Sequence, residues 1–189
     1  MSERGPEDAA EAGLRIARAL ETEGIAHALG GALALGAHGV PRGTLDVDLN
    51  VFVSDAEIPR VIAVLQRLGV ELDATAALAR AHKDGMFVGD WSGIRIDVFV
   101  PSIDFSHEAG RTRVSMTDDA GNSVWFLSPE ALSVFKLLFF RPKDLADLER
   151  LLAVQGAALD RAYVRRWIVD MMGQDDERVA AWDRLTRTF

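Results

Sequence analysis

Two aspartates one residue apart, Asp46 and Asp48, are the residues of this sequence best suited to chemistry. They lie in the segment LDVDLNVFV, in which polar and apolar residues alternate. Because successive side chains of a strand point to opposite faces, both carboxylates are expected on one face, with Val47 and Leu49 on the other. Neighbouring carboxylates repel each other until a cation neutralises them. Hard oxygen ligands at this spacing favour Mg²⁺ or Mn²⁺.

A third carboxylate, Asp97, lies in a second alternating segment, GIRIDVFV. The apolar face of this segment begins at Ile94, and Asp97 shares the other face with Arg95 and Phe99. If the segment pairs beside the Asp46/Asp48 strand, three carboxylates converge. Such a cluster can hold two cations about 3.5–4 Å apart, the arrangement used for in-line phosphoryl displacement.

A pair of glycines, Gly30 and Gly31, follows an apolar strand predicted over residues 25–29 and precedes a helix predicted over residues 32–38. Glycine at such a turn lets backbone N–H groups approach a phosphate, and the helix N-terminus favours the negative charge. Either motif alone is usually a tight turn or a solvated strand edge. Together, and in this order, they indicate metal-dependent phosphoryl chemistry.

These residues resemble the signature of the nucleotidyltransferase superfamily related to DNA polymerase beta. That signature is an apolar residue with Gly-Gly or Gly-Ser, a spacer, Asp-x-Asp and a carboxylate on a later strand. Here it falls on Leu29-Gly30-Gly31, Asp46, Asp48 and Asp97. Arg42 and Thr44 match the Arg-x-Thr that precedes the aspartates in the AbiEii-like, abortive-infection branch.

A second signature of that branch resembles the segment SPEALSVFKLLFFRPKDLADLERLL. The helical lysine of the branch corresponds to Lys136. Its Arg-x-Lys-Asp-x-x-Asp-Leu corresponds to Arg141, Lys143, Asp144, Asp147 and Leu148. The resemblance spans roughly residues 24–153.

The resemblance implies metal-dependent transfer of a nucleoside monophosphate from an NTP to an acceptor hydroxyl on an RNA end, a protein or a small molecule. Asp46, Asp48 and Asp97 would hold Mg²⁺ or Mn²⁺ and form the catalytic site, and Asp97 would take the proton of the acceptor. The nucleotide would be bound by Gly30, Gly31, Arg42, Thr44, Lys136, Lys143 and Asp147. The AbiEii-like branch further implies a toxin–antitoxin component that acts on tRNA and has an antitoxin partner.

Two other functions fit part of the pattern. A nucleotidyltransferase fold without activity would be a module that binds a nucleotide or a protein, although three intact carboxylates argue against lost catalysis. A small glycosyltransferase also uses Asp-x-Asp to hold Mn²⁺ and a nucleotide-sugar diphosphate. That alternative leaves the glycine pair and Asp97 unexplained.

The composition of the chain limits which binding partners and locations are expected. The chain has 189 residues, a net charge of −8 and no cysteine. The negative charge disfavours nonspecific DNA binding, which depends on Lys and Arg neutralising phosphates. The absence of cysteine excludes disulfides and fits a cytoplasmic location. The acidic N-terminus does not resemble a signal peptide, and no apolar run approaches the ~18 residues of a membrane span.

The hydrophobic periodicity predicts an α+β fold in two parts. Residues 1–127 are expected to form a nucleotidyltransferase-like mixed β-sheet with flanking helices, and residues 128–189 a C-terminal helical bundle packed on it. Expected helices cover residues 7–23, 55–68 and 74–81, and a hairpin joins residues 85–91 to 94–100. Two short strands flank Gly121-Asn122. From Ser128, which is followed by proline, the periodicity is helical to the end.

Overall fold

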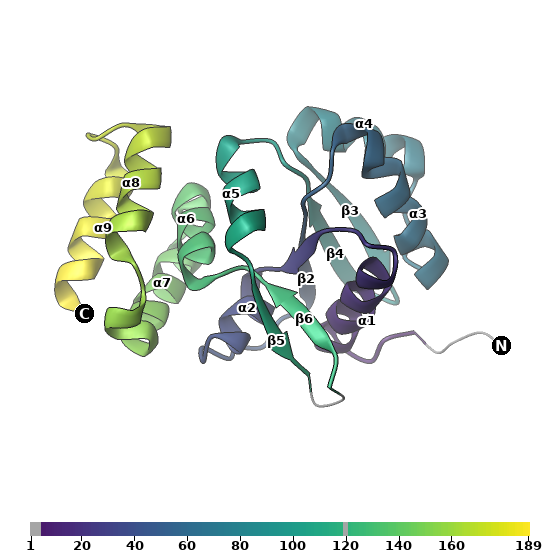
Figure 1. Ribbon diagram of the computed structural model, residues 1–189, viewed down its shortest axis with the longest axis horizontal. Helices are drawn as coiled ribbons and strands as arrows, with labels where there is room; N and C mark the ends of the chain where they lie inside the picture. The colour runs from purple at the N-terminus through teal and green to yellow at the C-terminus, as the bar shows by residue number, and fades with distance from the viewer. Residues whose placement is uncertain (1–4, 119–120) are drawn as a thin grey trace.

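A mixed six-stranded sheet covered by helices organises the chain (Figure 1). The computed structural model describes residues 5–118 and 121–189. The strand order is β3-β4-β2-β1-β6-β5, and the α+β prediction is confirmed. The strands are β1 (His27–Leu29), β2 (Asp46–Val51), β3 (Met86–Trp91), β4 (Ile94–Phe99), β5 (Val114–Thr117) and β6 (Ser123–Phe126).

The centre of the sheet combines parallel and antiparallel pairs. β2 runs parallel to β4, with Asp48 directly opposite Asp97. β1 is antiparallel to β2 and parallel to β6. β3 and β4 form the predicted hairpin, in which Ser92 and Gly93 adopt positive φ. The alternation that placed the aspartates on a strand face therefore describes β2 and β4.

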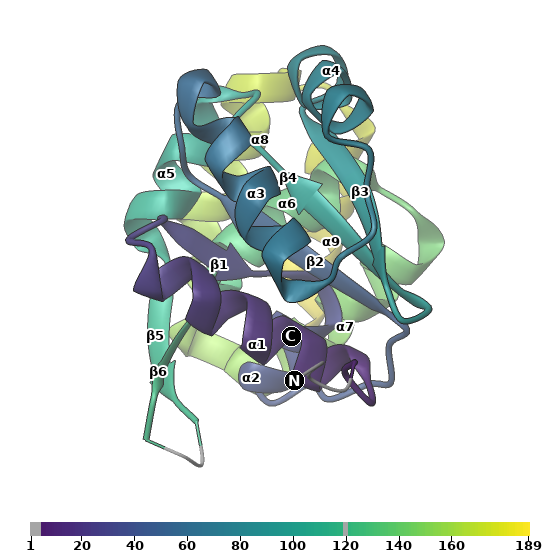
Figure 2. The ribbon, with the colours of Figure 1, turned by 90° about the vertical axis from the view of Figure 1, so that its right-hand side faces the viewer.

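One face of the sheet is buried under three helices, α1 (Ala9–Thr22), α3 (Ile58–Leu68) and α4 (Ala74–Asp84), and Figure 2 looks onto this side. Val47 and Ile96 are fully buried in a core that also contains Ile16 and Leu65 from these helices. Burial of the apolar positions of β2 and β4 leaves their polar positions on the opposite face. This packing is what presents the aspartates to the other side of the sheet.

The opposite side carries α2 (Gly31–Ala37), α5 (Asp104–Thr112) and the C-terminal helices α6 (Pro129–Phe139), α7 (Pro142–Gln155), α8 (Arg161–Met172) and α9 (Glu177–Thr188). A second apolar core joins α2, α5 and the C-terminal helices and includes Leu35, Phe105 and the fully buried Trp182. The helices α6 to α9 pack together, as expected for a C-terminal bundle.

Local signals set where the C-terminal helices begin. The Ser128 hydroxyl accepts a hydrogen bond from the Ala131 N–H, and Pro129 occupies the first turn of α6. Pro142 begins α7 in the same way. Phe140 adopts a left-handed conformation between the two helices and lets the chain reverse direction. No helix within the described ranges is both long and apolar enough to cross a lipid bilayer.

Candidate active site

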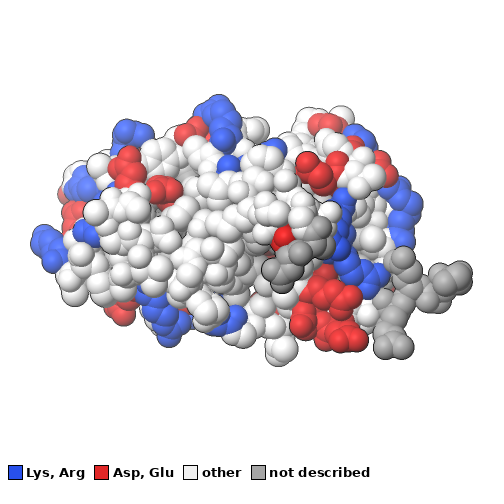
Figure 3. All heavy atoms as spheres, turned by 60° about the horizontal axis from the view of Figure 1, so that its bottom comes forward, with Lys and Arg blue, Asp and Glu red and all other residues white. Residues whose placement is uncertain are grey.

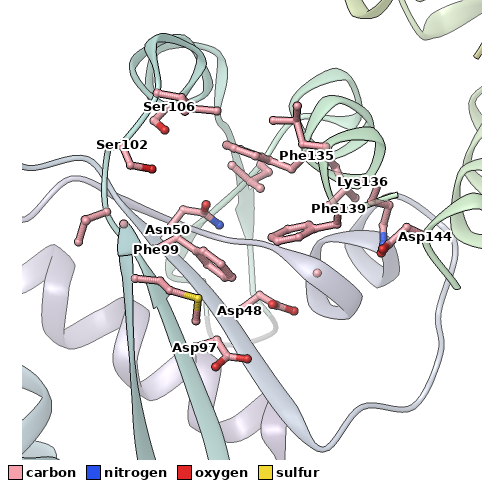
Figure 4. Close-up of a pocket in the computed structure, with 18 of the residues that line it drawn as sticks. Asp48, Asn50, Asp97, Phe99, Ser102, Ser106, Phe135, Lys136, Phe139 and Asp144 are labelled. Atoms are coloured by element: carbon pink, nitrogen blue, oxygen red, sulfur yellow. The ribbon is translucent and has the colours of Figure 1, made fainter. Parts of the chain in front are cut away.

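The three predicted carboxylates line a cleft of about 490 Å³ between the sheet and α6, and Figure 4 shows Asp48 and Asp97 on its floor. Asp46 and Asp48 come from β2 and Asp97 from β4, and all three line the cleft. Direct pairing of Asp48 with Asp97 follows from the parallel register of the two strands. The convergence expected from the sequence is therefore present.

The pKa of the Asp48 carboxyl is raised. Burial, followed by the neighbouring charges of Asp46 and Asp97, raises the pKa of the Asp48 carboxyl to about 6, against the opposing charges of Lys136 and Lys143. The other two carboxylates have local partners. The Thr44 hydroxyl donates to the Asp46 carboxylate, and Arg95 Nε donates to Asp97 Oδ1 at 2.8 Å.

The donor set fits a hard cation, although the carboxylates are not arranged as a finished metal site. Within residues 5–118 and 121–189, no three Asp, Glu, His or Cys side chains form a ready-made metal cluster. The ion pair between Arg95 and Asp97 gives a physical reason, because it holds one carboxylate on a cationic side chain. Burial first, and then the charges of Asp46 and Asp97, nevertheless raise the pKa of Asp48 and disfavour its ionised form when no cation is bound. A divalent ion with oxygen ligands would offset this effect.

The glycine pair fits tightly against β2. The Gly30 N–H donates to the Asp48 carbonyl oxygen at 2.8 Å. Gly31 has φ +51, and a Cβ atom there would overlap the Asp48 carboxylate. A Cβ atom at Gly30 would lie 2.8 Å from the side-chain nitrogen of Asn50. Glycine is therefore required at this turn because α2 begins in direct contact with the carboxylate strand.

Lys136 is buried where α6 meets α7. Its ammonium nitrogen lies 2.7 Å from Asp147 Oδ2 and 3.4 Å from Asp144 Oδ1. Burial alone would raise the pKa of Asp144, but hydrogen bonds from Arg141 and the charge of Lys136 lower it below its usual value. The spacing of the two aspartates on one helix face thus holds the buried lysine.

A group of cations lines the cleft around Lys136. Arg42 Nε lies 3.4 Å from Asp147 Oδ1, which ties the loop before β2 to α7. Arg141 pairs with Asp144 at 2.7 Å, and Lys143 is exposed at the start of α7. In Figure 4, Lys136 and Asp144 lie on one side of Asp48, and Ser102 and Ser106 lie on the other.

Most of the residues predicted from the sequence share this cleft. Those that line it are Gly31, Arg42, Asp46, Asp48, Asp97, Lys136 and Lys143. The remaining three support the lining residues by direct contact: Gly30 bonds to Asp48, Thr44 to Asp46, and Asp147 to Lys136. The chemical roles assigned to these residues remain predictions.

The other end of the cleft was not predicted from the sequence. Its lining includes Asn50, Phe99, Ser102, Ser106 and Phe139. Two of these carried a usable signal, because Asn50 and Phe99 continue the alternation two residues beyond Asp48 and Asp97. Ser106 lies in α5, where no element was predicted over residues 104–112, and Ser102 lies in the loop just before that helix.

No protein-family model and no curated protein sequence matches this chain. Solved structures are similar to it. A solution structure of the antibiotic-resistance factor ANT(2'')-Ia has 17% identity and a TM-score of 0.59, covering 93% of this chain and 95% of that one. A crystal structure of ANT(2'')-Ia with adenylyl-2''-tobramycin has 16% identity and a TM-score of 0.63, covering 86% and 98%.

A third structure, an antigenic nucleotidyltransferase-like protein from Paracoccidioides brasiliensis, has 15% identity and a TM-score of 0.53, covering 95% of this chain and 94% of that one. At these identities the similarity is evidence of the fold alone. The matches cover 86–95% of this chain and 94–98% of the similar chains. The chain therefore has a nucleotidyltransferase-like fold.

Proposed function

We propose that this protein is a metal-dependent nucleotidyltransferase, which moves a nucleoside monophosphate from an NTP to an acceptor hydroxyl. The observation that carries the proposal is the pairing of Asp48 with Asp97 on adjacent parallel strands, beside Asp46 and facing a cleft with cationic walls. A nucleotidyltransferase-like fold around that cleft supports the same reaction.

Asp46, Asp48 and Asp97 would hold Mg²⁺ or Mn²⁺. The bound ions would neutralise charge on the phosphoryl oxygens and acidify the acceptor hydroxyl. The cation would displace Arg95 from Asp97, since both compete for the same carboxylate. Thr44 would keep the Asp46 carboxylate oriented toward the cleft.

The cationic side chains would bind the triphosphate. Lys136, Lys143, Arg42 and Arg141 line the cleft on the side where the β- and γ-phosphates would lie. The turn at Gly31 would allow the same phosphates to approach the backbone. Asp147 would fix both Lys136 and Arg42 by its ion pairs, and Asp97 would accept the proton of the attacking hydroxyl.

The proposal includes membership of the AbiEii-like branch and a role as a toxin held in check by an antitoxin. It is supported by Arg42 and Thr44, which contact Asp147 and Asp46, and by the contact of Lys136 with Asp147. Induced expression should arrest growth, and Asp48→Ala should abolish the arrest. Normal growth on induction of the wild type would reject the toxin role and leave the transferase reaction untouched.

The transferase reaction is tested with purified protein, cell extract, each α-³²P-labelled NTP and Mg²⁺ or Mn²⁺. Label should move to an acceptor with the wild type and not with Asp46→Ala/Asp48→Ala. Retention of nucleotide binding without any transfer would favour the second candidate, a module that binds nucleotide without chemistry. The ion pair that occupies Asp97 is the specific observation that keeps this second candidate in view.

A further inference from the structure

The floor of the cleft is ordered along the strands. On the exposed face of β2 and β4, Asp46 lies opposite Arg95, Asp48 opposite Asp97, and Asn50 opposite Phe99. Successive pairs on one face of a strand are about 7 Å apart. The cleft therefore runs from a charged end, past the carboxylate centre, to an end formed by an amide and an aromatic ring.

The chemistry of the proposed function indicates which end of the cleft would hold the pyrophosphate and which the acceptor. In nucleotidyl transfer the acceptor oxygen attacks the α-phosphorus in line with the departing pyrophosphate, so the two lie on opposite sides of that atom. Lys136, a cation that suits pyrophosphate, lies with Asp144 on one side of Asp48 in Figure 4, and the ion pair of Arg141 with Asp144 places a second cation nearby. The acceptor must therefore enter from the Asn50 and Phe99 end.

The walls of the acceptor end are apolar. Phe99 and Phe139 meet edge to face with ring centroids 6.0 Å apart. Phe139 is 49% exposed and Ile103 is 40% exposed, so both present hydrophobic surface to a ligand. Other apolar side chains complete this wall: Phe52, Met86, Val100, Pro101, Phe135 and Leu138.

Few charged side chains reach this end. The lysines and arginines of the described cleft lining are Arg42, Arg95, Lys136, Arg141 and Lys143. Of these, Arg141 meets the apolar wall, with its guanidinium carbon 4.9 Å from the centroid of the Phe139 ring. Two acidic residues line the cleft beyond the central carboxylates. Asp84 is exposed, and Asp144 is buried and already paired with Lys136 and Arg141. An RNA end would need cations here for its phosphates, and a polyamine would need several free carboxylates.

Two buried polar side chains at the acceptor end have no partner. Asn50 and Ser106 are each 7% exposed and line the cleft. Within the described chain, neither the Asn50 carboxamide nor the Ser106 hydroxyl makes a hydrogen bond. Figure 4 shows both at the edge of the same open space. The polar atoms of both side chains open onto the cleft rather than into the protein interior, so a ligand seated there can hydrogen-bond to them.

We infer that the acceptor is an uncharged small molecule with an apolar, ring-containing body and a hydroxyl group, seated against Phe99 and Phe139 and hydrogen-bonded to Asn50 and Ser106. This inference rests on the proposed function, whose acceptor it names by class. The acceptor oxygen forms a bond to the α-phosphorus while the bond from that phosphorus to the bridging oxygen breaks. Pyrophosphate leaves toward Lys136, and the acceptor proton passes to Asp97.

Binding is tested separately from turnover by saturation-transfer NMR with 2-(naphthalen-2-yl)ethanol as the probe. The full chain should saturate the naphthyl protons, and Phe139→Ala should reduce the effect at least threefold. Phe189→Ala is the matched control, because Phe189 is 46% exposed but lies outside the cleft lining, and it should leave the signal unchanged. Equal signals from the wild type and Phe139→Ala, or no signal from either, would overturn the inference.

Competition identifies what else the acceptor end accepts. Spermine, AMP and a short RNA oligonucleotide should each leave the probe in place. Displacement by spermine would mean a polycationic acceptor, displacement by AMP would mean a nucleobase subsite, and displacement by RNA would mean a nucleic-acid acceptor. Any of the three would overturn the inference.

A transfer assay then separates this inference from the proposed function. With α-³²P-labelled NTP and Mn²⁺, label should appear on the naphthyl alcohol and not on tobramycin. Label on tobramycin alone would refute the acceptor class and uphold the transferase. Probe binding that is lost in Phe139→Ala, with no NTP turnover on any acceptor, would uphold the apolar subsite and reject the transferase.

Discussion

At the scale of single residues, the candidate site holds carboxylates of like charge close together. Three carboxylates share one face of two paired strands, and the central one, Asp48, has a pKa of about 6. Such a perturbed group in a cleft is typical of functional sites. The raised pKa also affects stability. Ionisation of a carboxyl with a raised pKa lowers the free energy of unfolding, so stability falls as the group loses its proton.

Asp48→Asn should therefore stabilise the cation-free protein above pH 6. The folded state binds more protons than the unfolded state between the ordinary pKa of 3.8 and about 6, so wild-type stability falls as pH rises through that window. At pH 8 the variant should gain on the order of 2 kcal/mol in free energy of unfolding, and the gain should vanish near pH 4. Urea unfolding with EDTA at both pH values measures it.

Asp170→Asn is the matched control, because Asp170 is exposed on α8 and outside the cleft. It should leave the free energy of unfolding nearly unchanged at both pH values. If Asp48→Asn shows no larger gain at pH 8 than at pH 4, the pKa of Asp48 is not raised in the folded protein.

Gly31→Ala should damage the site through contact as well as through backbone conformation. The new methyl group would overlap the Asp48 carboxylate and would also require φ +51. We expect a loss of about 2–4 kcal/mol in free energy of unfolding, combining strain with displacement of the aspartate. Transfer activity should fall at least a hundredfold.

Two control glycines separate the contributions. Gly24 has φ +66 and no atoms within 4 Å of a Cβ, so Gly24→Ala reports the backbone strain alone. Gly43 has neither feature, so Gly43→Ala should be close to neutral. A loss in Gly31→Ala no greater than that in Gly24→Ala would contradict a role for the Asp48 contact.

At the scale of elements, the strands and the C-terminal helices were predictable and α5 was not. Alternation in β2 and β4 was strong because one face of each is fully buried, as Val47 and Ile96 show. Proline after Ser128 and after Arg141 marked the starts of α6 and α7. The start of α5 has no side-chain cap at Ile103, so the helix depends on tertiary packing of Phe105 against Phe135 and Trp167.

The candidate site divides in the same way. Its charged half could be predicted because Asp46, Asp48 and Asp97 belong to short, regular patterns along the chain. Its apolar half joins β4, α5 and α6, and only the tertiary fold brings Phe99, Ser106 and Phe139 to one wall. A pairing such as Lys136 with Asp147 is intermediate, since the helix spacing was visible but the burial was not.

The junction of α6 and α7 yields a prediction at this scale. Asp147→Asn should lower the free energy of unfolding by about 3 kcal/mol, because it removes the close counter-charge of the buried Lys136. The loop that carries Arg42 should loosen as well, since Asp147 holds its guanidinium. Guanidinium unfolding gives the first effect, and amide hydrogen exchange over residues 39–45 gives the second.

Glu149→Gln supplies the comparison, because Glu149 is an exposed carboxylate on the same helix. Its free energy of unfolding should stay within about 0.5 kcal/mol of the wild type. Losses of equal size in the two variants would mean that Lys136 does not depend on Asp147.

At the scale of the whole molecule, the surface is mixed in charge. The side chains suited to binding a ligand gather in the cleft. On the face shown in Figure 3, basic side chains lie among acidic ones, consistent with a net charge of −8. This surface gives little support to nonspecific binding of nucleic acid. The cleft instead gathers side chains from both parts of the chain, including Asp97 from β4 and Lys136 from α6.

Cation binding should therefore stabilise the whole fold. With Mg²⁺ at a hundred times its dissociation constant, the gain in free energy of unfolding is about 2.7 kcal/mol. It should be smaller at pH 5 than at pH 8, because the cation must displace the proton that Asp48 holds below about pH 6. Thermal unfolding with and without Mg²⁺ at both pH values checks this, and an equal gain in Asp48→Asn would locate the cation elsewhere.

In the proposed reaction, Asp46, Asp48 and Asp97 direct attack on the α-phosphorus of an NTP. The most direct measurement incubates the protein with an acceptor-containing cell extract, a divalent cation and ATP labelled with ³²P at either the α or the γ position. We expect the α-label to join an acceptor and the γ-label to be released as pyrophosphate. Both events should disappear in Asp97→Asn and persist in Asp170→Asn. Transfer of γ-label, or α-label transfer that survives Asp97→Asn, would contradict the proposed reaction.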